Sequence, residues 1–145
     1  MTTEVFADPT VFITRELVPE VQRADFVDAL FGIAYPLQLE PTVFEFASRL
    51  SPTYRGAYWN MYALSNGGWY MCPDEDNRFD VRCPNGYQGS LTADAFGIVT
   101  VLYAFSHLSF IANGDAASNY VRHYHLLREF AAEHEEAAAI FAAID

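Results

Sequence analysis

The spacing of apolar residues predicts helices toward the two ends of the chain and strands between them. Between residues 19 and 32, apolar side chains recur at helical spacing, with a proline at the start and a glycine at the stop. Residues 41–52 repeat the pattern in a shorter helix bounded by two prolines. Two more helices are predicted over residues 115–134 and 135–144, and the last of these is rich in alanine.

The segment from residue 95 to residue 112 is apolar on nearly all sides, which is typical of a core helix or of a membrane span. Polar residues interrupt it, and no basic residue lies near either end to anchor it in a membrane. We therefore expect a buried central helix. Asp94 falls in its first turn, where a carboxylate complements the helix dipole, and Ser90 or Thr92 is placed to cap it.

The middle of the chain has the pattern of β-strands. Aromatic segments flank Asn66-Gly67, the dipeptide that most strongly favours a two-residue hairpin turn. Such a turn pairs Leu64 with Trp69 and gives the hairpin two largely apolar faces. One face then carries Tyr58, Asn60, Tyr62, Leu64, Trp69 and Met71, and the other carries Trp59, Met61, Ala63, Tyr70 and Cys72. We expect the hairpin to be covered on both faces, or covered on one and used for binding on the other.

Residues 78–83 alternate as a half-exposed third strand, with Phe79, Val81 and Cys83 inward, and a short fourth strand or bulge follows a second Asn-Gly pair. Residues 1–17 show no sustained period and are expected to form an arm or short strand. The sequence thus predicts a single α+β domain over residues 1–145. A small antiparallel sheet of three or four strands packs among about five helices, and residues 1–16 form a loosely ordered arm.

The composition is unusual in its basic residues. Apolar residues make up 52% of the 145 positions, enough for a substantial core, and the formal net charge is −11. That charge makes direct binding to nucleic acid or to an anionic membrane unfavourable. The nineteen acidic residues are an ordinary number for this length, whereas all eight basic residues are arginine and lysine does not occur. This argues against a mimic of the DNA backbone, which needs dense rows of carboxylates.

No spacing of residues indicates a catalytic, cofactor-binding or metal site. His123 and His125 lie two apart on a predicted helix, so they point in different directions and cannot share a metal ion. His134 lacks a second histidine at metal-binding spacing. Cys72 and Cys83 are too few for a disulfide framework; they could face one another across neighbouring strands, and we interpret them as buried apolar residues.

The glycine pair also has a structural interpretation. Asn66, Gly67 and Gly68 resemble a phosphate-binding loop in composition, but no Lys-Ser/Thr follows them and the next element is a strand. The chain has no Gly-x-Ser-x-Gly nucleophile elbow, and the acidic residues between 74 and 80 are those of a solvated loop. We expect the glycines to form a turn and to have no chemical role.

Four stretches together resemble the plasmid-borne antirestriction proteins of the KlcA/ArdB kind. They are residues 17–32, residues 51–73 with Tyr-Trp and Leu-Ser-Asn-Gly-Gly-Trp-Tyr, residues 86–108, and residues 122–145 with the Ala-Ile-Asp ending. The resemblance covers almost everything from about Leu17 onward. The first sixteen residues and the loop Pro-Asp-Glu-Asp-Asn do not match the family pattern.

The resemblance implies a cytoplasmic α+β protein that protects incoming plasmid or phage DNA from host type I restriction-modification enzymes, with no catalytic residues and no cofactor. Its expected partner is the restriction complex, reached directly or indirectly. Composition favours protein–protein interference over the alternative, a DNA mimic occupying the enzyme's DNA-binding surface. A small hydrolase or an adaptor for another plasmid protein are the remaining alternatives. Candidate contacts to a partner are the hairpin aromatics, whichever prove exposed: Tyr58, Trp59, Tyr62, Trp69 and Tyr70.

Overall fold

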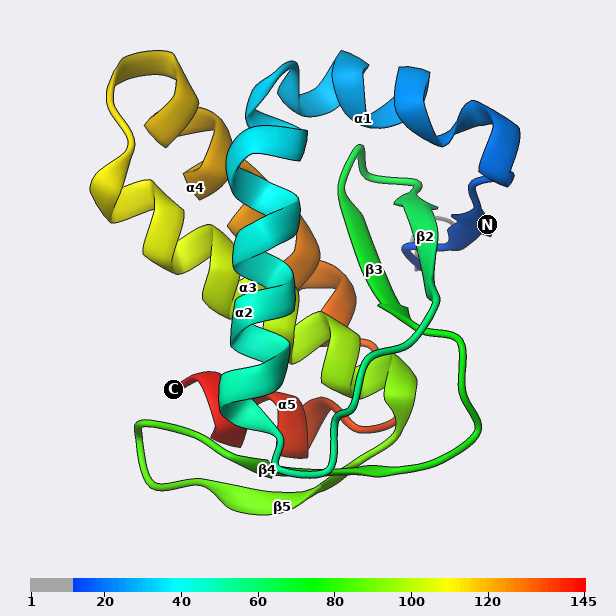
Figure 1. Cartoon of the computed structure of the whole chain (residues 1–145), viewed down its shortest axis with the longest axis vertical. Helices are drawn as coiled ribbons and strands as arrows, with labels where there is room; N and C mark the ends of the chain where they lie inside the picture. The colour runs from blue at the N-terminus through cyan, green and yellow to red at the C-terminus, as the bar shows by residue number, and fades with distance from the viewer. Residues whose placement is uncertain (1–11) are drawn as a thin grey trace, which may run out of the picture.

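The computed structural model describes residues 12–145, so part of the predicted N-terminal arm lies outside the described residues. The α+β class is confirmed: helices surround two small antiparallel sheets (Figure 1). The strands are β1 (Arg15–Leu17), β2 (Trp59–Leu64), β3 (Trp69–Pro73), β4 (Phe79–Arg82) and β5 (Gln88–Leu91). The helices are α1 (Arg23–Phe31), α2 (Glu40–Leu50), α3 (Ala93–Ile111), α4 (Gly114–Ala131) and α5 (Ala137–Ile144), with short 3₁₀ and π turns before α1 and α2.

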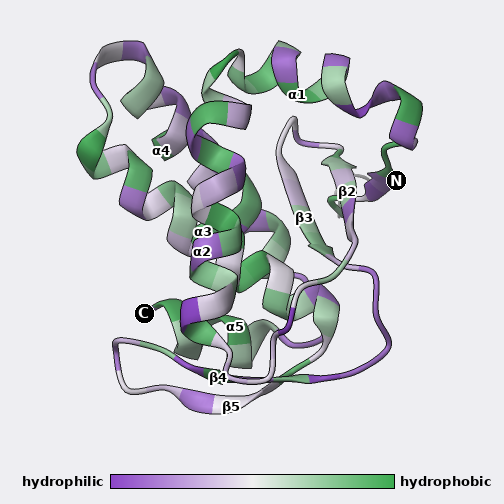
Figure 2. Cartoon of the chain, in the orientation of Figure 1, coloured by the Kyte–Doolittle hydropathy of each residue, from purple (hydrophilic) through white to green (hydrophobic). Residues whose placement is uncertain are grey.

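The strands divide into two sheets rather than one. The first has the order β1-β2-β3, and the second consists of β4 and β5. The hydrophilic connection after β3 carries the chain away from the first sheet, so β4 lies at the far end of the molecule (Figure 2). The third strand of the hairpin sheet is instead β1, from the predicted arm. Cys72 and Cys83, which could have faced one another across neighbouring strands, are buried free thiols in different places: Cys72 lies in β3 of the first sheet, and Cys83 directly follows β4 of the second.

The hairpin has a different register from the one that the Asn-Gly pair predicts. Ala63 pairs with Trp69, and the backbone N–H of Leu64 donates to the carbonyl of Gly68 at 2.9 Å, which leaves a three-residue loop. Gly67, at φ +92°, provides the left-handed residue that follows a type I turn in such loops. This shift of one residue moves the inner side chains of β3 to the other face. Trp69 and Met71 therefore lie with Trp59, Met61 and Ala63, whereas Tyr70 and Cys72 lie with Asn60 and Tyr62.

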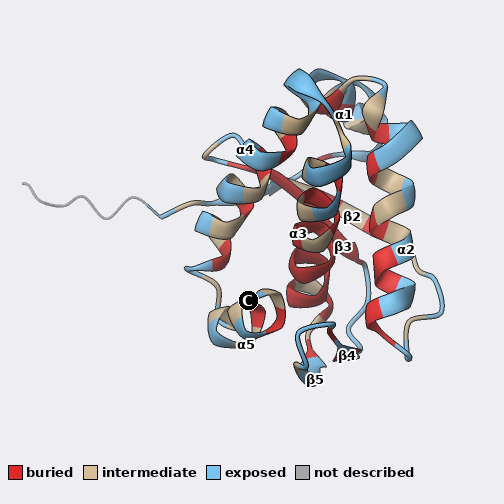
Figure 3. Cartoon of the chain, turned by 90° about the vertical axis from the view of Figure 1, so that its left-hand side faces the viewer, coloured by how far each residue is buried: buried red, intermediate tan, exposed pale blue. Residues whose placement is uncertain are grey.

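The central helix α3 is the predicted buried helix. Figure 3 shows it between α2 and α4 with most of its length buried, and twelve of its residues are buried. The helix is long and apolar enough to cross a membrane, but its hydropathy is that of a core helix enclosed by α2, α4, α5 and β3. Thr92 caps it by accepting the N–H of Ala95 at 3.2 Å. Gly97 allows β3 to pass directly over the helix.

An aromatic cluster beneath α1 fills the space between α3, α4 and the hairpin. Phe31 of α1 contacts Trp69 of β3 at a centroid distance of 5.5 Å and Phe105 of α3 at 6.0 Å. His123 of α4 is fully buried in the same cluster, with its ring 4.7 Å from that of Phe31. Its Nδ1 has no hydrogen-bond partner among residues 12–145. Burial, together with the nearby charge of Arg122, lowers the pKa of His123 to about 4.

His123 should therefore destabilise the protein in acid. The unfolded chain binds a proton at this residue near pH 6.5 and the folded chain only near pH 4, so stability falls by about 1.4 kcal/mol per pH unit within that window and is unaffected above it. We expect the H123F variant to lose this pH dependence, gaining about 3 kcal/mol relative to the wild type between pH 7 and pH 4. Urea unfolding at each pH measures the difference. H125N, at an exposed position of the same helix, is the control, and parallel pH curves for H123F and the wild type would refute the assignment.

Candidate functional site

The structure separates the five predicted hairpin aromatics by exposure. Trp59, Trp69 and Tyr70 are buried, and Tyr62 is partly buried against Tyr70, with which it stacks at a centroid distance of 5.3 Å. Tyr58, just before β2, is 50% exposed. Of the five, Tyr58 is thus the residue that this conformation offers most openly to a partner.

The hairpin turn packs against a helix. The side-chain amide of Asn66 donates to the carbonyl of Leu126 on α4 at 2.9 Å, and the Asn66 side-chain oxygen accepts the N–H of Gly68 at the same distance. A Cβ at Gly68 would lie 3.0 Å from the Cβ of Leu126. These contacts fix the turn to α4 and account for Asn66 and Gly68 in structural terms.

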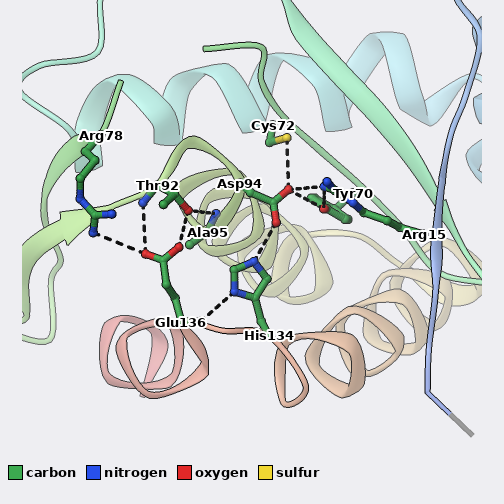
Figure 4. Close-up of polar contacts among 9 residues, drawn as sticks. All are labelled: Arg15, Tyr70, Cys72, Arg78, Thr92, Asp94, Ala95, His134 and Glu136. Carbon is green, nitrogen blue, oxygen red and sulfur yellow. Dashed lines mark hydrogen bonds and ion pairs between the residues drawn. The ribbon is translucent and has the colours of Figure 1, made fainter. Parts of the chain in front are cut away.

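Polar side chains converge on Asp94, at the N-terminal end of α3 (Figure 4). Its Oδ1 accepts from Arg15 at 2.5 Å and from the hydroxyl of Tyr70 at 2.6 Å, and the thiol of Cys72 lies 3.6 Å away. Its Oδ2 lies 2.7 Å from Nε2 of His134. The Asp94 cluster, as we call these five residues, thereby joins β1, β3, the start of α3 and the α4–α5 connection.

Electrostatics keeps the Asp94 carboxylate charged. Burial by itself would raise the pKa of Asp94, but hydrogen bonds from His134 and Tyr70 and the charge of Arg15 outweigh it and hold this pKa below its usual value. Burial raises the pKa of the Cys72 thiol, and the neighbouring Asp94 charge adds to the effect. Cys72 is consequently a neutral thiol, the unreactive form of cysteine.

The hydrogen bonds of His134 determine which tautomer it adopts. The backbone N–H of Glu136 donates to Nδ1 at 2.9 Å, so Nδ1 carries no proton and Nε2 donates to Asp94. A histidine that acts as a general base needs one nitrogen free to accept a proton from a substrate or nucleophile. In this conformation both nitrogens of His134 are engaged, so the Asp94–His134 pair serves to connect elements.

A second carboxylate holds the other side of the same helix end. Glu136 accepts from the backbone N–H of Thr92 at 3.2 Å and from its hydroxyl, and it lies 3.6 Å from the guanidinium of Arg78 (Figure 4). Since Thr92 is also the cap of α3, the segment before α5 is fixed to the start of α3 at two points, Asp94 and Thr92.

A wide, open hollow of about 440 Å³ adjoins the Asp94 cluster, lined by Phe12, Ile13, Thr14, Arg15, Asp94, Phe130, Glu133, His134 and Glu135. Most of its charged groups already have hydrogen-bond partners: Arg15 and His134 are paired with Asp94, and Glu133 accepts from the backbone N–H of Ile13 at 2.9 Å. Within residues 12–145, no group of three or more histidine, cysteine or acidic side chains is placed to hold a metal ion. His123 and His125 face apart, buried and exposed respectively, as their spacing predicts.

Comparison with known proteins places this arrangement in a family. The sequence matches the antirestriction protein family over residues 52–145. Two Escherichia coli proteins named antirestriction protein KlcA are similar to it: one is 46% identical over 92% of this chain and 95% of the relative, and the other is 42% identical over 99% of each. The chain belongs to the antirestriction protein family. The KlcA/ArdB resemblance is thereby confirmed.

A solved structure has the same fold as this chain. It superposes with a TM-score of 0.85 at 45% identity, covering 99% of this chain and all of that one. It belongs to work on the KlcA and ArdB proteins, which show a novel fold and antirestriction activity against type I DNA restriction systems in vivo but not in vitro. Most of the Asp94 cluster lies within the region that matches the antirestriction family, whereas Arg15 lies before it.

Proposed function

We propose that the protein inhibits host type I restriction in the cytoplasm, protecting incoming plasmid or phage DNA without catalysis. Membership of the antirestriction family is the observation that carries this proposal, and the type I activity of the structurally similar KlcA and ArdB proteins supplies the target. Their activity in vivo but not in vitro supports a mechanism that requires more than the isolated enzyme. We infer interference through a protein contact within the cell.

The distribution of charge supports a protein contact over DNA mimicry. Four arginines form ion pairs with acidic side chains, which places positive charge among the carboxylates: Arg15–Asp94, Arg49–Glu45, Arg78–Glu136 and Arg128–Asp145. A surface that imitates the DNA backbone needs closely spaced, unpaired negative charge. A hydrolase is not favoured, because the nitrogens of His134 are already hydrogen-bonded and the Cys72 pKa is raised.

Phage plating on type I restricting and non-restricting hosts, with and without the protein, tests the proposal. We expect protection in the restricting host alone. Two neutralised variants, D25N/D28N on α1 and E75Q/D76N/D80N around β4, carry exposed substitutions and should protect within about twofold of the wild type, since surface changes of this kind leave stability nearly unchanged. Absence of protection in every type I host would refute the function. Protection that falls in step with lost charge would identify a DNA mimic instead.

A further inference from the structure

The outer edge of β1 carries backbone groups that point away from the sheet. Ser65 N–H donates to the carbonyl of Thr14 at 2.8 Å, and Val18 N–H donates to the carbonyl of Met61 at 2.9 Å. Because bonding alternates along an antiparallel strand, the N–H and C=O groups of Arg15 and Leu17 face outward. No residue of the described part of the chain hydrogen-bonds to them. All three residues of β1 are exposed.

Exposed apolar side chains lie on β1 and in the turn that follows it. Leu17 of β1 is 52% exposed and Val21 of the turn is 92% exposed, and the hydroxyl of Tyr58 donates to Glu20 of the same turn at 3.2 Å. The guanidinium of Arg23 stacks on the Tyr58 ring at 4.9 Å and holds it in place. Open strand edges with apolar side chains are sites at which proteins recruit another strand.

Carboxylates flank this strand edge and the turn after it. Glu16 and Glu20 are exposed, and the backbone N–H of Asp74 donates to the carbonyl of Tyr58 at 2.7 Å, which places this exposed acid beside the tyrosine. We use the name β1 edge surface for the outer backbone of β1 together with the side chains of Glu16, Leu17, Glu20, Val21, Tyr58 and Asp74. The surface combines two unpaired backbone positions, an apolar strip and negative charge.

The charge argues against a second copy of the chain as the occupant. The antiparallel register that would satisfy all four outward groups between two copies pairs Arg15 with Leu17. That register places Glu16 directly opposite Glu16 of the other copy, and like charges facing each other across strands are destabilising. A foreign strand with a cation at that position gains an attraction instead.

We propose that the β1 edge surface binds an extended segment of a protein partner, which adds to β1 as a fourth strand. The segment carries arginine or lysine opposite Glu16 and apolar side chains against Leu17, Val21 and Tyr58. This inference rests on the proposed function for the identity of the partner, which belongs to the machinery through which restriction is inhibited. The binding step itself is a property of this chain alone.

The direct test uses a synthetic strand as the probe. Acetyl-Thr-Val-Arg-Val-Arg-Val-Thr amide is added to the ¹⁵N-labelled protein, and a matched peptide with Glu in place of Arg serves as control. We expect the arginine peptide to shift the Arg15 and Leu17 amide resonances and slow their hydrogen exchange at least tenfold. The glutamate peptide should have no effect, and E16R should abolish the response to arginine. Equal responses to both peptides, or none at β1, would overturn the proposal.

The cellular test uses charge substitutions in matched pairs. L17K/V21K places two cations on the β1 edge surface, whereas I33K/F110K places two cations at exposed apolar positions elsewhere. At equal soluble amounts, we expect L17K/V21K to lose phage protection at least tenfold and I33K/F110K to retain it. If L17K/V21K and the wild type protect equally well, the proposed docking surface is wrong, but the proposed function is unaffected. A wild type that fails to protect would refute the function, and the peptide experiment would still decide the docking. A concentration-dependent dimer that E16R alters would assign the edge to a second copy and overturn the proposal.

Discussion

A methyl group added at Gly97 is expected to destabilise the protein by about 3 kcal/mol or more. A Cβ at this position would lie 2.3 Å from the Cβ of Cys72 and 2.5 Å from the carbonyl oxygen of Met71. Both neighbours are part of β3 or fixed to its backbone, so the strand and α3 must separate to make room. The intrinsic preference of helices has the opposite sign, because alanine is favoured over glycine by about 1 kcal/mol in a helix interior.

Urea unfolding of G97A therefore distinguishes the two effects by sign. A loss of stability would show that the steric contact between β3 and α3 outweighs the helix preference for alanine. A gain in stability would show that β3 can move aside at little cost. A116S adds one heavy atom at an exposed position of α4 and should remain within about 0.5 kcal/mol of the wild type. Because β3 holds Tyr70 and Cys72 over Asp94, we also expect G97A to yield less soluble protein in cells and correspondingly weaker phage protection.

The elements were predictable from the sequence wherever one local pattern decided them. The central helix, the inward side chains of β4 and the helix stop at Gly32 all follow from periodicity and from residues that end helices, and the structure confirms them. The helical spacing over residues 19–32 includes Val21, but Val21 precedes α1, in the 3₁₀ turn, and is 92% exposed. A helical period does not reveal where the regular helix begins.

The hairpin shows how a correct motif can give an incorrect register. The Asn66-Gly67 pair predicts a turn, and a turn is present, but Asn66 bonds to α4 and Gly67 occupies the left-handed position of a three-residue loop. The helix residue that holds Asn66 lies sixty positions away in the sequence, so this contact is outside the local pattern. That one-residue difference decides that Tyr70, rather than Trp69, faces Asp94.

The Asp94 cluster could not be found from spacing. Its members are separated by long stretches of chain: Arg15 precedes Asp94 by 79 residues, Tyr70 precedes it by 24, and His134 follows it by 40. The sequence identified Asp94 as a helix-dipole partner and His134 as a histidine without metal spacing. What brings them together is the packing of α4 and α5 around α3, which no local pattern encodes.

The D94N variant is expected to lose about 2–3 kcal/mol of stability, because it removes a charge that receives hydrogen bonds from three side chains while leaving their shape unchanged. The pKa of Asp94 is lower in the folded protein than in the unfolded chain. Its contribution is therefore complete above about pH 4, the usual carboxyl pKa, and is lost as the pH falls through the lower folded pKa. Urea unfolding at pH 7 measures the size of the contribution, and a series of unfolding curves below about pH 4 measures the window in which it is lost.

The matched control for D94N is E45Q, the same change of acid to amide in an exposed ion pair with Arg49 at 3.4 Å, and it should cost no more than about 0.5 kcal/mol. Hydrogen exchange measures the effect of D94N on β1 itself. Arg15 fixes β1 to Asp94, so the amides of Glu16 and Val18, which bond toward β2, should exchange faster in D94N and unchanged in E45Q. If D94N is as stable as the wild type with β1 equally protected, the cluster does not hold the sheet to α3, and the packing of β3 over Gly97 must hold it alone.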